Sequence, residues 1–442
     1  MFEKVRFRLA VLLAAPVMAV CQAQTPDKAK LDQFLDRLLE KNKGMGSVTL
    51  ARDGNVLYQH AFGYELVNGN EKKELNAETK FRIASITKTY TVVMVFQLVE
   101  EKKLQMSDTL DRFFPQIPNA SRITIAQILG HRSGIHDLEP DGSWGMQPRT
   151  REEVVARIAQ GKPDFEPDTK HGYSNASYIL LGYIVEKVGG RPYQDALRER
   201  ITSKIGLKNT YLGSGKSDPA KNEAFSYRYI GGWKEAAELD FSVPAGAGAI
   251  VSTTADMAKF IQALFDRKLL SAESLKQMTT MRENEGMGLE AFSFAGKTFY
   301  GHTGGSGSSG AWLAYYPEEK LAIAYASNAK IYPIKDIVSG VLDIYWNRPF
   351  AIPSFESFAV STEVLDRYVG VYVIPGTPAR VTIKREGGTL YFQPGAQTPV
   401  ALEATAEDKF KIEPFVAFEF DAAKGEMTVN RGGQKRLFTK EK

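Results

Sequence analysis

The stretch Phe81-Arg82-Ile83-Ala84-Ser85-Ile86-Thr87-Lys88 begins a long apolar segment and carries a serine and a lysine three positions apart. Apolar residues recur from Ile86 to Val99, and a polar run from Glu100 to Lys103 follows them. This pattern predicts a buried helix over residues 81–104. On a helix, side chains at this spacing share one face, so Ser85 and Lys88 would lie within hydrogen-bond reach of each other.

A lysine can accept the proton of a neighbouring serine only if the lysine amine is neutral. Its pKa must then fall below the ordinary value of about 10.4, through burial or neighbouring cations. The start of a helix also supplies free N–H groups and a positive dipole end, which would stabilise an oxyanion. Taken alone, the motif equally fits an N-cap serine with a surface lysine. Residues 327–330 repeat the spacing in a segment that we predict to be a loop.

Tyr173-Ser174-Asn175 is a second motif, placed just before a predicted helix. A phenol can shuttle protons if cations lower its pKa, and an asparagine amide can hold a substrate carbonyl. In the structural alternative, Asn175 caps the helix and Tyr173 only packs. Tyr345 and Asn347 repeat the pattern at the end of the last predicted helix, so this motif is also weak by itself.

His302-Thr303-Gly304-Gly305 ends a predicted strand and leads into a glycine- and serine-rich turn. Glycines on an edge strand let a substrate backbone approach closely, and His302 adds a titratable group. The structural alternative is a glycine-rich loop around a histidine. A phosphate-binding loop is not supported, because no Gly-Lys-Ser/Thr sequence follows.

The wider pattern predicts an α+β fold. Strand signals occur at residues 46–51, 56–61, 246–252, 299–302, 311–316 and 321–327, and amphipathic helices at 27–43, 255–265 and 334–345. The expected architecture is an antiparallel sheet flanked by helices, with an inserted helical lobe at residues 107–240. Residues 347–360 are predicted to be a linker, and the short alternating strands of residues 361–442 a small all-β sandwich or barrel.

The three motifs occur in the order found in the serine β-lactamase and penicillin-binding protein superfamily, which this chain resembles over roughly residues 30–346. The resemblance extends to Ile128–Ile135 and Gly248–Thr254, and is nearest to class C β-lactamases and secreted serine D-Ala-D-Ala carboxypeptidases. It implies a hydrolase domain over residues 24–346. The tail after residue 360 lies outside the resemblance but is similar to small β-domains fused to related esterases and peptidases.

The resemblance also implies residue roles. Ser85 would be the nucleophile, Lys88 and Tyr173 would share the proton transfers, and Asn175 would position the substrate. The N–H groups of Ser85 and Gly305 would form the oxyanion hole. Thr303, within the segment His302-Thr303-Gly304, would contact a substrate carboxylate or polar tail. The motifs with Tyr173 and His302 resemble the carboxypeptidase branch more closely, since the lactamases usually carry lysine where His302 stands. A histidine, with an ordinary pKa of about 6.5, is largely neutral at pH 7 and lacks the permanent charge that attracts anionic substrates, which argues against efficient β-lactam hydrolysis.

Residues 1–23 have the features of a secretory signal peptide: Lys4, Arg6 and Arg8, a short apolar run, and Cys21-Gln22-Ala23 before the expected cut. An exported, periplasmic or secreted protein is therefore expected. Lipid anchoring at Cys21 is disfavoured because Val20 is not small. The formal net charge of +4 gives no electrostatic reason to expect nucleic acid, and no other window is apolar enough for a transmembrane span.

No cofactor and no metal are expected, since one cysteine cannot build a cysteine zinc site and the histidines lack metal-ligand spacing. We therefore interpret His60, His131, His136 and His171 as structural. The favoured function is an acyl-enzyme serine hydrolase acting on a D-amino-acid-containing peptide or a small ester. Alternatives are a non-catalytic protein that binds cell-wall peptides, a β-lactamase with weak activity, and a binding role carried by residues 361–442. The sequence does not define the oligomeric state.

Overall fold

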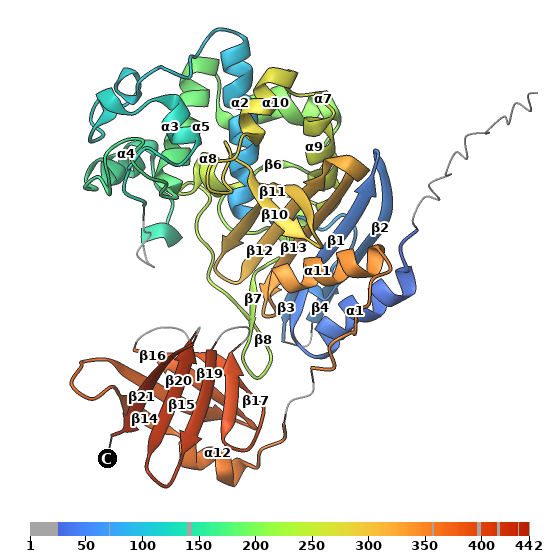
Figure 1. Ribbon diagram of the computed structural model, residues 1–442, viewed down its shortest axis with the longest axis vertical. Coiled ribbons are helices and arrows are strands. Elements are labelled where there is room, and N and C mark those ends of the chain that lie inside the picture. Colours follow the sequence, from blue (N-terminus) through green and yellow to red (C-terminus); the bar gives the residue numbers. More distant parts are fainter. Residues whose placement is uncertain are drawn as a thin grey trace, which may run out of the picture.

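A computed structural model describes residues 25–441, except 70, 139–143, 356–357, 396–398, 413–415 and 432. The predicted signal peptide, residues 1–23, lies outside the described residues, as does part of the predicted linker at 347–360. The α+β architecture expected from the sequence is confirmed: an antiparallel sheet flanked by helices, a helical lobe and a C-terminal β-domain (Figure 1). None of the described helices is long and apolar enough to cross a bilayer.

A six-stranded antiparallel sheet forms the centre of the larger part of the molecule. Its strands, in spatial order, are β10 (Glu290–Phe294), β11 (Lys297–Ser306), β12 (Ser309–Tyr316), β13 (Leu321–Lys330), β1 (Gly44–Arg52) and β2 (Asn55–Phe62). The turn at Asp53 and Gly54 joins β1 to β2, and β12 pairs antiparallel with β13. Strand β10 pairs with β11 only as far as Gly301, so the C-terminal part of β11 keeps one edge free of β10.

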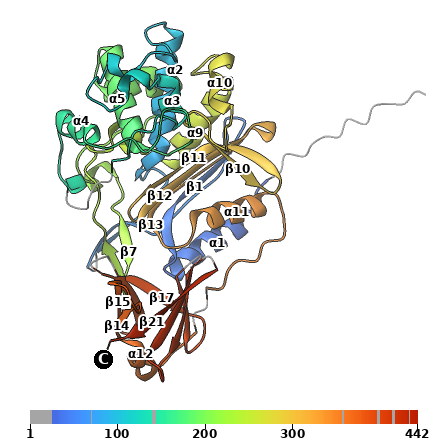
Figure 2. The same ribbon diagram turned by 60° about the vertical axis from the view of Figure 1, so that its left-hand side comes forward.

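Helices cover both faces of this sheet (Figure 2). On one face, α1 (Lys28–Glu40) and α11 (Ile334–Tyr345) pack through Phe34, Leu38 and Val341 against Val48 and Tyr325 of the sheet. On the other face a larger core joins the sheet to the helical lobe. The helices of that lobe and its surroundings are α2 (Thr87–Glu100), α3 (Ile125–Leu129), α4 (Arg151–Ala159), α5 (Asn175–Gly189), α6 (Tyr193–Leu197), α7 (Ser203–Ile205), α8 (Ala245–Gly248), α9 (Thr254–Phe265) and α10 (Ala272–Thr279).

Short strands complete this part of the molecule. They are β3 (Tyr64–Asn68) with β4 (Glu71–Glu74), then β5 (Phe81–Arg82), β9 (Ile250–Ser252) and β6 (Tyr211–Leu212) in one small sheet, and the hairpin β7 (Tyr227–Tyr229) with β8 (Trp233–Glu235). In Figure 1 the β7–β8 hairpin extends from the sheet toward the C-terminal β-domain. An ion pair between Lys43 and Glu403 also joins the two parts of the molecule.

The C-terminal β-domain is a closed antiparallel barrel, which decides between the sandwich and the barrel left open by the sequence. Its strands are β14 (Gly370–Val373), β15 (Arg380–Glu386), β16 (Thr389–Pro394), β17 (Val400–Ala404), β18 (Lys409–Ile412), β19 (Val416–Asp421), β20 (Glu426–Arg431) and β21 (Gln434–Lys440). Leu390, Phe410 and Phe418 lie in its core. A helix that the sequence analysis missed, α12 (Thr362–Tyr368), packs its Leu365 against the same core, so this domain is not purely β.

Three local predictions were wrong. Phe81 and Arg82 form β5 rather than the start of the long helix, whose α-helical part begins only at Thr87. Residues 246–248 belong to α8 rather than to a strand, because Gly246 packs directly against Gly182 of α5, where a Cβ would lie 2.9 Å from the Gly246 Cα. Residues 327–330 are not a loop: β13 continues to Lys330 because β1 pairs with it along its whole length, around a bulge at Met45 and Gly46.

Candidate active site

A small pocket of about 120 Å³ lies between the turn Ala84–Ile86 that precedes α2, the start of α5, α8 and the end of β11. Ser85, Asn175 and Gly305 line it, together with apolar side chains that include Leu138 and Phe241. Three segments far apart in the sequence therefore meet at one place, as the motifs predicted. The apolar wall beside Ser85 suits a small apolar substituent of a substrate.

Ser85 and Lys88 are in direct contact. Ser85 lies in a 3-10 turn, Ala84–Ile86, that leads into α2, and Lys88 lies in the first turn of α2. The Lys88 Nζ is 2.9 Å from the Ser85 Oγ, 2.7 Å from the Asn175 Oδ1 and 2.9 Å from the carbonyl oxygen of Ala247. The surface lysine of the structural alternative is ruled out, because Lys88 has no exposed area.

Burial changes the protonation of Lys88. Loss of solvent disfavours the ammonium form and lowers the pKa of Lys88 from 10.5 to about 7, although Asp137 and Glu290 oppose the shift. A large fraction of the amine is therefore neutral near pH 7, as a general base for Ser85 requires. This is the condition that the sequence alone left open.

Tyr173 completes a hydrogen-bonded chain at the serine. Its hydroxyl donates to the Ser85 Oγ over 2.8 Å, and its ring stacks on His131 with centroids 4.4 Å apart. The structure contradicts the cation-lowered pKa that a proton-shuttling phenol would need. Burial of the hydroxyl raises the pKa of Tyr173, so the phenol stays protonated and is a donor rather than a base.

Both ends of the Asn175 side-chain amide are hydrogen-bonded to other side chains of the protein. Its Oδ1 accepts from Lys88, and its Nδ2 donates to Asp137 over 2.9 Å. It does not cap the helix, because Ser174 is the N-cap of α5 and accepts from the Ser177 N–H. The geometry therefore makes Asn175 a positioning residue for Lys88 more directly than a substrate ligand.

The turn that presents Ser85 is strained and closely packed. Ala84 has a φ of +46°, which is unusual for a residue other than glycine. A Cβ added to Gly304 would lie 2.2 Å from the carbonyl oxygen of Ile83, so only glycine lets β11 approach the turn this closely. Gly305, the next residue, lines the pocket together with Ser85. The two proposed oxyanion donors thus lie on segments that are in contact with each other.

The rest of the predicted strand motif differs from expectation. His302 is 2% exposed and lies behind the pocket wall rather than in it. Burial and the nearby Lys88 lower the pKa of His302 to about 3, so it is neutral at pH 7, as expected. The Thr303 hydroxyl donates to the Glu290 Oε1 over 3.3 Å, so the donor expected to contact a substrate carboxylate is already bonded to a carboxyl group of the protein.

The sequence analysis assigned no role at the site to three residues that contribute to it. Asp137 binds both the Asn175 amide and the Ala176 N–H. His131, predicted to be structural, packs on Tyr173 and accepts from the Ser174 N–H at Nδ1. Glu290 reaches Thr303 because β10 pairs Glu290 with Gly301. A signal for Glu290 existed in the Ala295-Gly296 turn, which fixes that register.

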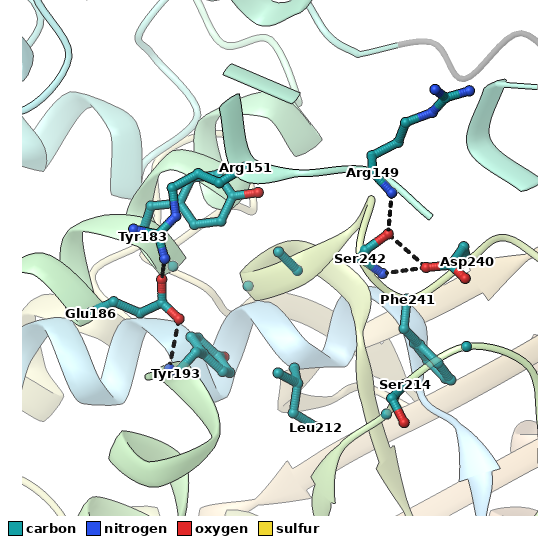
Figure 3. A pocket seen from close by; sticks show the side chains of 15 residues that line it. Arg149, Arg151, Tyr183, Glu186, Tyr193, Leu212, Ser214, Asp240, Phe241 and Ser242 are labelled. Carbon is teal, nitrogen blue, oxygen red and sulfur yellow. Dashed lines mark hydrogen bonds and ion pairs between the residues drawn. The ribbon is translucent and has the colours of Figure 1, made fainter. Parts of the chain in front are cut away.

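A second cavity, of about 330 Å³, has Phe241 among its lining residues in common with the first (Figure 3). Its charged groups are already paired: Arg151 with Glu186, and Asp240 with the Ser242 hydroxyl at 2.6 Å. None of the predicted site residues lines it. Across the described part of the chain, no group of His, Cys, Asp and Glu side chains is arranged to hold a metal ion.

Comparison with known proteins identifies the class. The beta-lactamase family model matches residues 31–335, and this chain belongs to that family. Among its relatives is penicillin-binding protein 4* of Bacillus subtilis (strain 168), 26% identical over 91% of this chain and 97% of the relative. D-alanyl-D-alanine-carboxypeptidase/endopeptidase AmpH of Escherichia coli (strain K12) is 24% identical over 78% of this chain and 98% of its own.

Solved structures show the same fold. D-amino acid amidase from Ochrobactrum anthropi SV3, complexed with L-phenylalanine amide, superposes with a TM-score of 0.65 and 26% identity, over 72% of this chain and 98% of its own. The octameric penicillin-binding protein homologue from Pyrococcus abyssi covers 93% of this chain and 100% of its own, at a TM-score of 0.62 and 24% identity. This second likeness concerns the fold alone, and its coverage extends to the C-terminal barrel.

Proposed function

We propose that this chain is a serine hydrolase that forms an acyl-enzyme on Ser85 and cleaves an amide or ester of a D-amino acid residue. The observation that carries the proposal is the buried Lys88, with a pKa lowered to about 7 and its Nζ 2.9 Å from the Ser85 Oγ. The preference for a D-amino acid residue is supported by the likeness to D-amino acid amidase.

Each step of the reaction has a group placed for it. Neutral Lys88 accepts the Ser85 proton as the Oγ attacks the carbonyl carbon, and the N–H groups of Ser85 and Gly305 stabilise the oxyanion. The bond to the leaving group then breaks, and the leaving amine or alcohol takes a proton from Tyr173, which regains one from the Lys88 ammonium. Water, deprotonated by the same groups, attacks the acyl carbon and releases the acid and free Ser85.

The neighbourhood of Thr303 favours a leaving group without a carboxylate. Glu290 is half-buried and accepts from the Thr303 hydroxyl, so a substrate carboxylate there would compete for that donor. Burial raises the pKa of Glu290, and in its ionised form it would also repel the substrate carboxylate. Arg82 lines the same pocket, but Glu238 at 2.9 Å and the Leu239 carbonyl at 2.7 Å already satisfy it. We therefore propose an amidase or esterase rather than a carboxypeptidase or an efficient β-lactamase.

A panel of chromogenic substrates tests this proposal. We expect the 4-nitroanilide of D-alanine to be cleaved faster than its L-enantiomer, and nitrocefin, which carries a carboxylate, to be cleaved slowly. In the Glu290→Gln protein, kcat/KM for D-Ala-D-Ala relative to D-alanyl-D-alanine amide should rise about tenfold, since a like charge is removed. Nitrocefin turnover above that of every amide and ester, or an unchanged ratio in the variant, would contradict the proposal.

A further inference from the structure

Another cavity, of about 660 Å³, lies between the barrel and the part of the molecule that contains the six-stranded sheet. Its lining residues include Arg228 and Tyr229 of β7 and residues 400–403 of β17, and in Figures 1 and 2 β7 extends toward the barrel. We call it the interdomain cleft. Ile331, Phe358 and Val400 line it with 37%, 50% and 42% of their area exposed, so it gathers half of the large hydrophobic side chains that are exposed among the described residues.

The cleft is also cationic. Its basic lining residues are Lys41, Lys43, Arg228, Lys330 and Lys411. Its single acidic lining residue, Glu403, is paired with Lys43 and lies 4.0 Å from Lys411. The Arg228 Nε is buried and has no hydrogen-bond partner among the described residues. Apolar walls together with surplus positive charge are suited to a chain that is partly apolar and carries an anionic group.

Lys330 connects the cleft to the catalytic pocket. Gly305 lines the pocket, and Gly307 and Ser308, two and three residues further on, line the cleft. The Lys330 Nζ lies 3.8 Å from the position of a Cβ on Gly305, and its Cδ lies over Gly310. None of the ion pairs of the described chain includes Lys330, while the surrounding protein lowers its pKa. Lys330 therefore places an amine that has no carboxylate partner among the described residues beside a proposed oxyanion donor.

We propose that the interdomain cleft binds the acyl side of the substrate, and that Lys330 recognises an anionic group, a carboxylate or a phosphate, on an extension of the D-amino acid's nitrogen. This inference rests on the proposed function. Thr303 precedes Gly305 on β11 and contacts Glu290, whereas Gly307 and Ser308, which follow Gly305, line the cleft. The leaving-group side of the scissile bond would therefore meet an acidic residue, and the acyl side would meet basic ones. The substrate is then an acidic N-acylated amide or ester rather than a free amino acid amide.

Matched substrates measure this recognition. We compare 4-nitroanilides of D-alanine whose nitrogen carries a succinyl, glutaryl or adipoyl group with the same compounds capped as methyl esters. At the length that reaches Lys330, the free acid should exceed its methyl ester about tenfold in kcat/KM, as expected for one charge-assisted contact. The ratio should fall toward one in Lys330→Met and persist in Lys330→Arg. Lys276→Met, an exposed lysine on α10, is the control for net charge.

Further arms separate the remaining outcomes. A phosphonate in place of the terminal carboxylate shows which anion is preferred. If the Lys330→Met protein does not fold, Lys41→Met should lower the ratio of free acid to methyl ester in kcat/KM for the substrates with the longer acyl groups. Binding of the same pairs to the Ser85→Ala protein gives the ratio without turnover, so a failure of catalysis is distinguished from a failure of anion recognition. Equal binding of acids and methyl esters at every length, or a ratio that Lys330→Met leaves unchanged, would overturn the proposal.

Discussion

The Ser85→Ala protein is expected to hydrolyse a chromogenic amide about 10⁴-fold more slowly than the wild type, or worse, as when the nucleophile of a serine hydrolase is removed. The structure gives the reason. Ser85 is the one hydroxyl that contacts both Lys88 and Tyr173 among the hydrogen bonds of the described residues, and it lines the pocket. No other group occupies its position relative to Gly305. Initial rates on the 4-nitroanilide of D-alanine measure the effect.

Ser327→Ala is the matched control for this substitution. Ser327 belongs to the second Ser-x-x-Lys sequence, but it lies within β13 and its hydroxyl donates to the Met45 carbonyl. We expect Ser327→Ala to lower the Tm, through loss of two buried hydrogen bonds, to the Met45 carbonyl and from the Ala329 N–H, and to keep its activity. Wild-type-like rates in Ser85→Ala, or equal losses in the two variants, would contradict the assignment.

The second large effect concerns Lys88 and pH. Because the neutral amine is the base and the pKa of Lys88 is about 7, kcat/KM should rise as the pH increases through 7 and level off above about pH 8. Lys88→Met should lower kcat/KM by about 10²–10⁴-fold, the usual value of a general base, and remove the rising limb. A pH series between 5 and 9 measures both.

Glu285 is the control for this pH profile. Burial raises its pKa to about 7 as well, and Glu290 adds to the shift. Glu285 therefore titrates in the same range, but no hydrogen bond between it and the reacting groups is found among the described residues. In Glu285→Gln the rising limb should stay near pH 7. A limb that disappears in Glu285→Gln and persists in Lys88→Met would assign the titration to the glutamate.

The central elements could be predicted because their patterns are local and strong. The apolar run after Ser85 is long enough to define α2, and the helix predicted at residues 255–265 is present as α9, with Thr253 as its N-cap. The β12–β13 pair follows from two alternating runs and a short turn. The spacing of Ser85 and Lys88 also predicted their contact, because an i,i+3 pair on a helical turn needs no tertiary information.

Errors arose where tertiary packing decided the outcome. The short apolar run from Gly246 to Ser252 fits a helix or a strand equally well, and the contact with Gly182 makes its first part helical. Lys330 was assigned to a loop because Pro333 follows soon after, whereas pairing with β1 extends the strand. The pKa of Tyr173 depends on how deeply its hydroxyl is buried, which no sequence pattern states.

The charges around the site were the least predictable part. Glu290 and Lys330 lie 13 and 27 residues from Thr303 in the sequence, measured as differences of residue number. Glu290 belongs to no motif, and the Ser-x-x-Lys sequence that ends at Lys330 gives no sign that this lysine lies near Gly305. Strand register brings Glu290 to Thr303, and the antiparallel order of β11, β12 and β13 brings Lys330 over Gly305. The sequence analysis assigned the charge preference to His302 alone, although the structure places two further charged groups there.

Covalent labelling tests the central claim most directly. Treatment with a fluorophosphonate, followed by intact-mass measurement and peptide mapping, should show one adduct per chain, located on the peptide that contains Ser85. Labelling should be absent in Ser85→Ala and slow in Lys88→Met, since the amine activates the hydroxyl. An unmodified wild-type protein, or an adduct on any other residue, would contradict the claim that a buried neutral lysine makes this serine reactive.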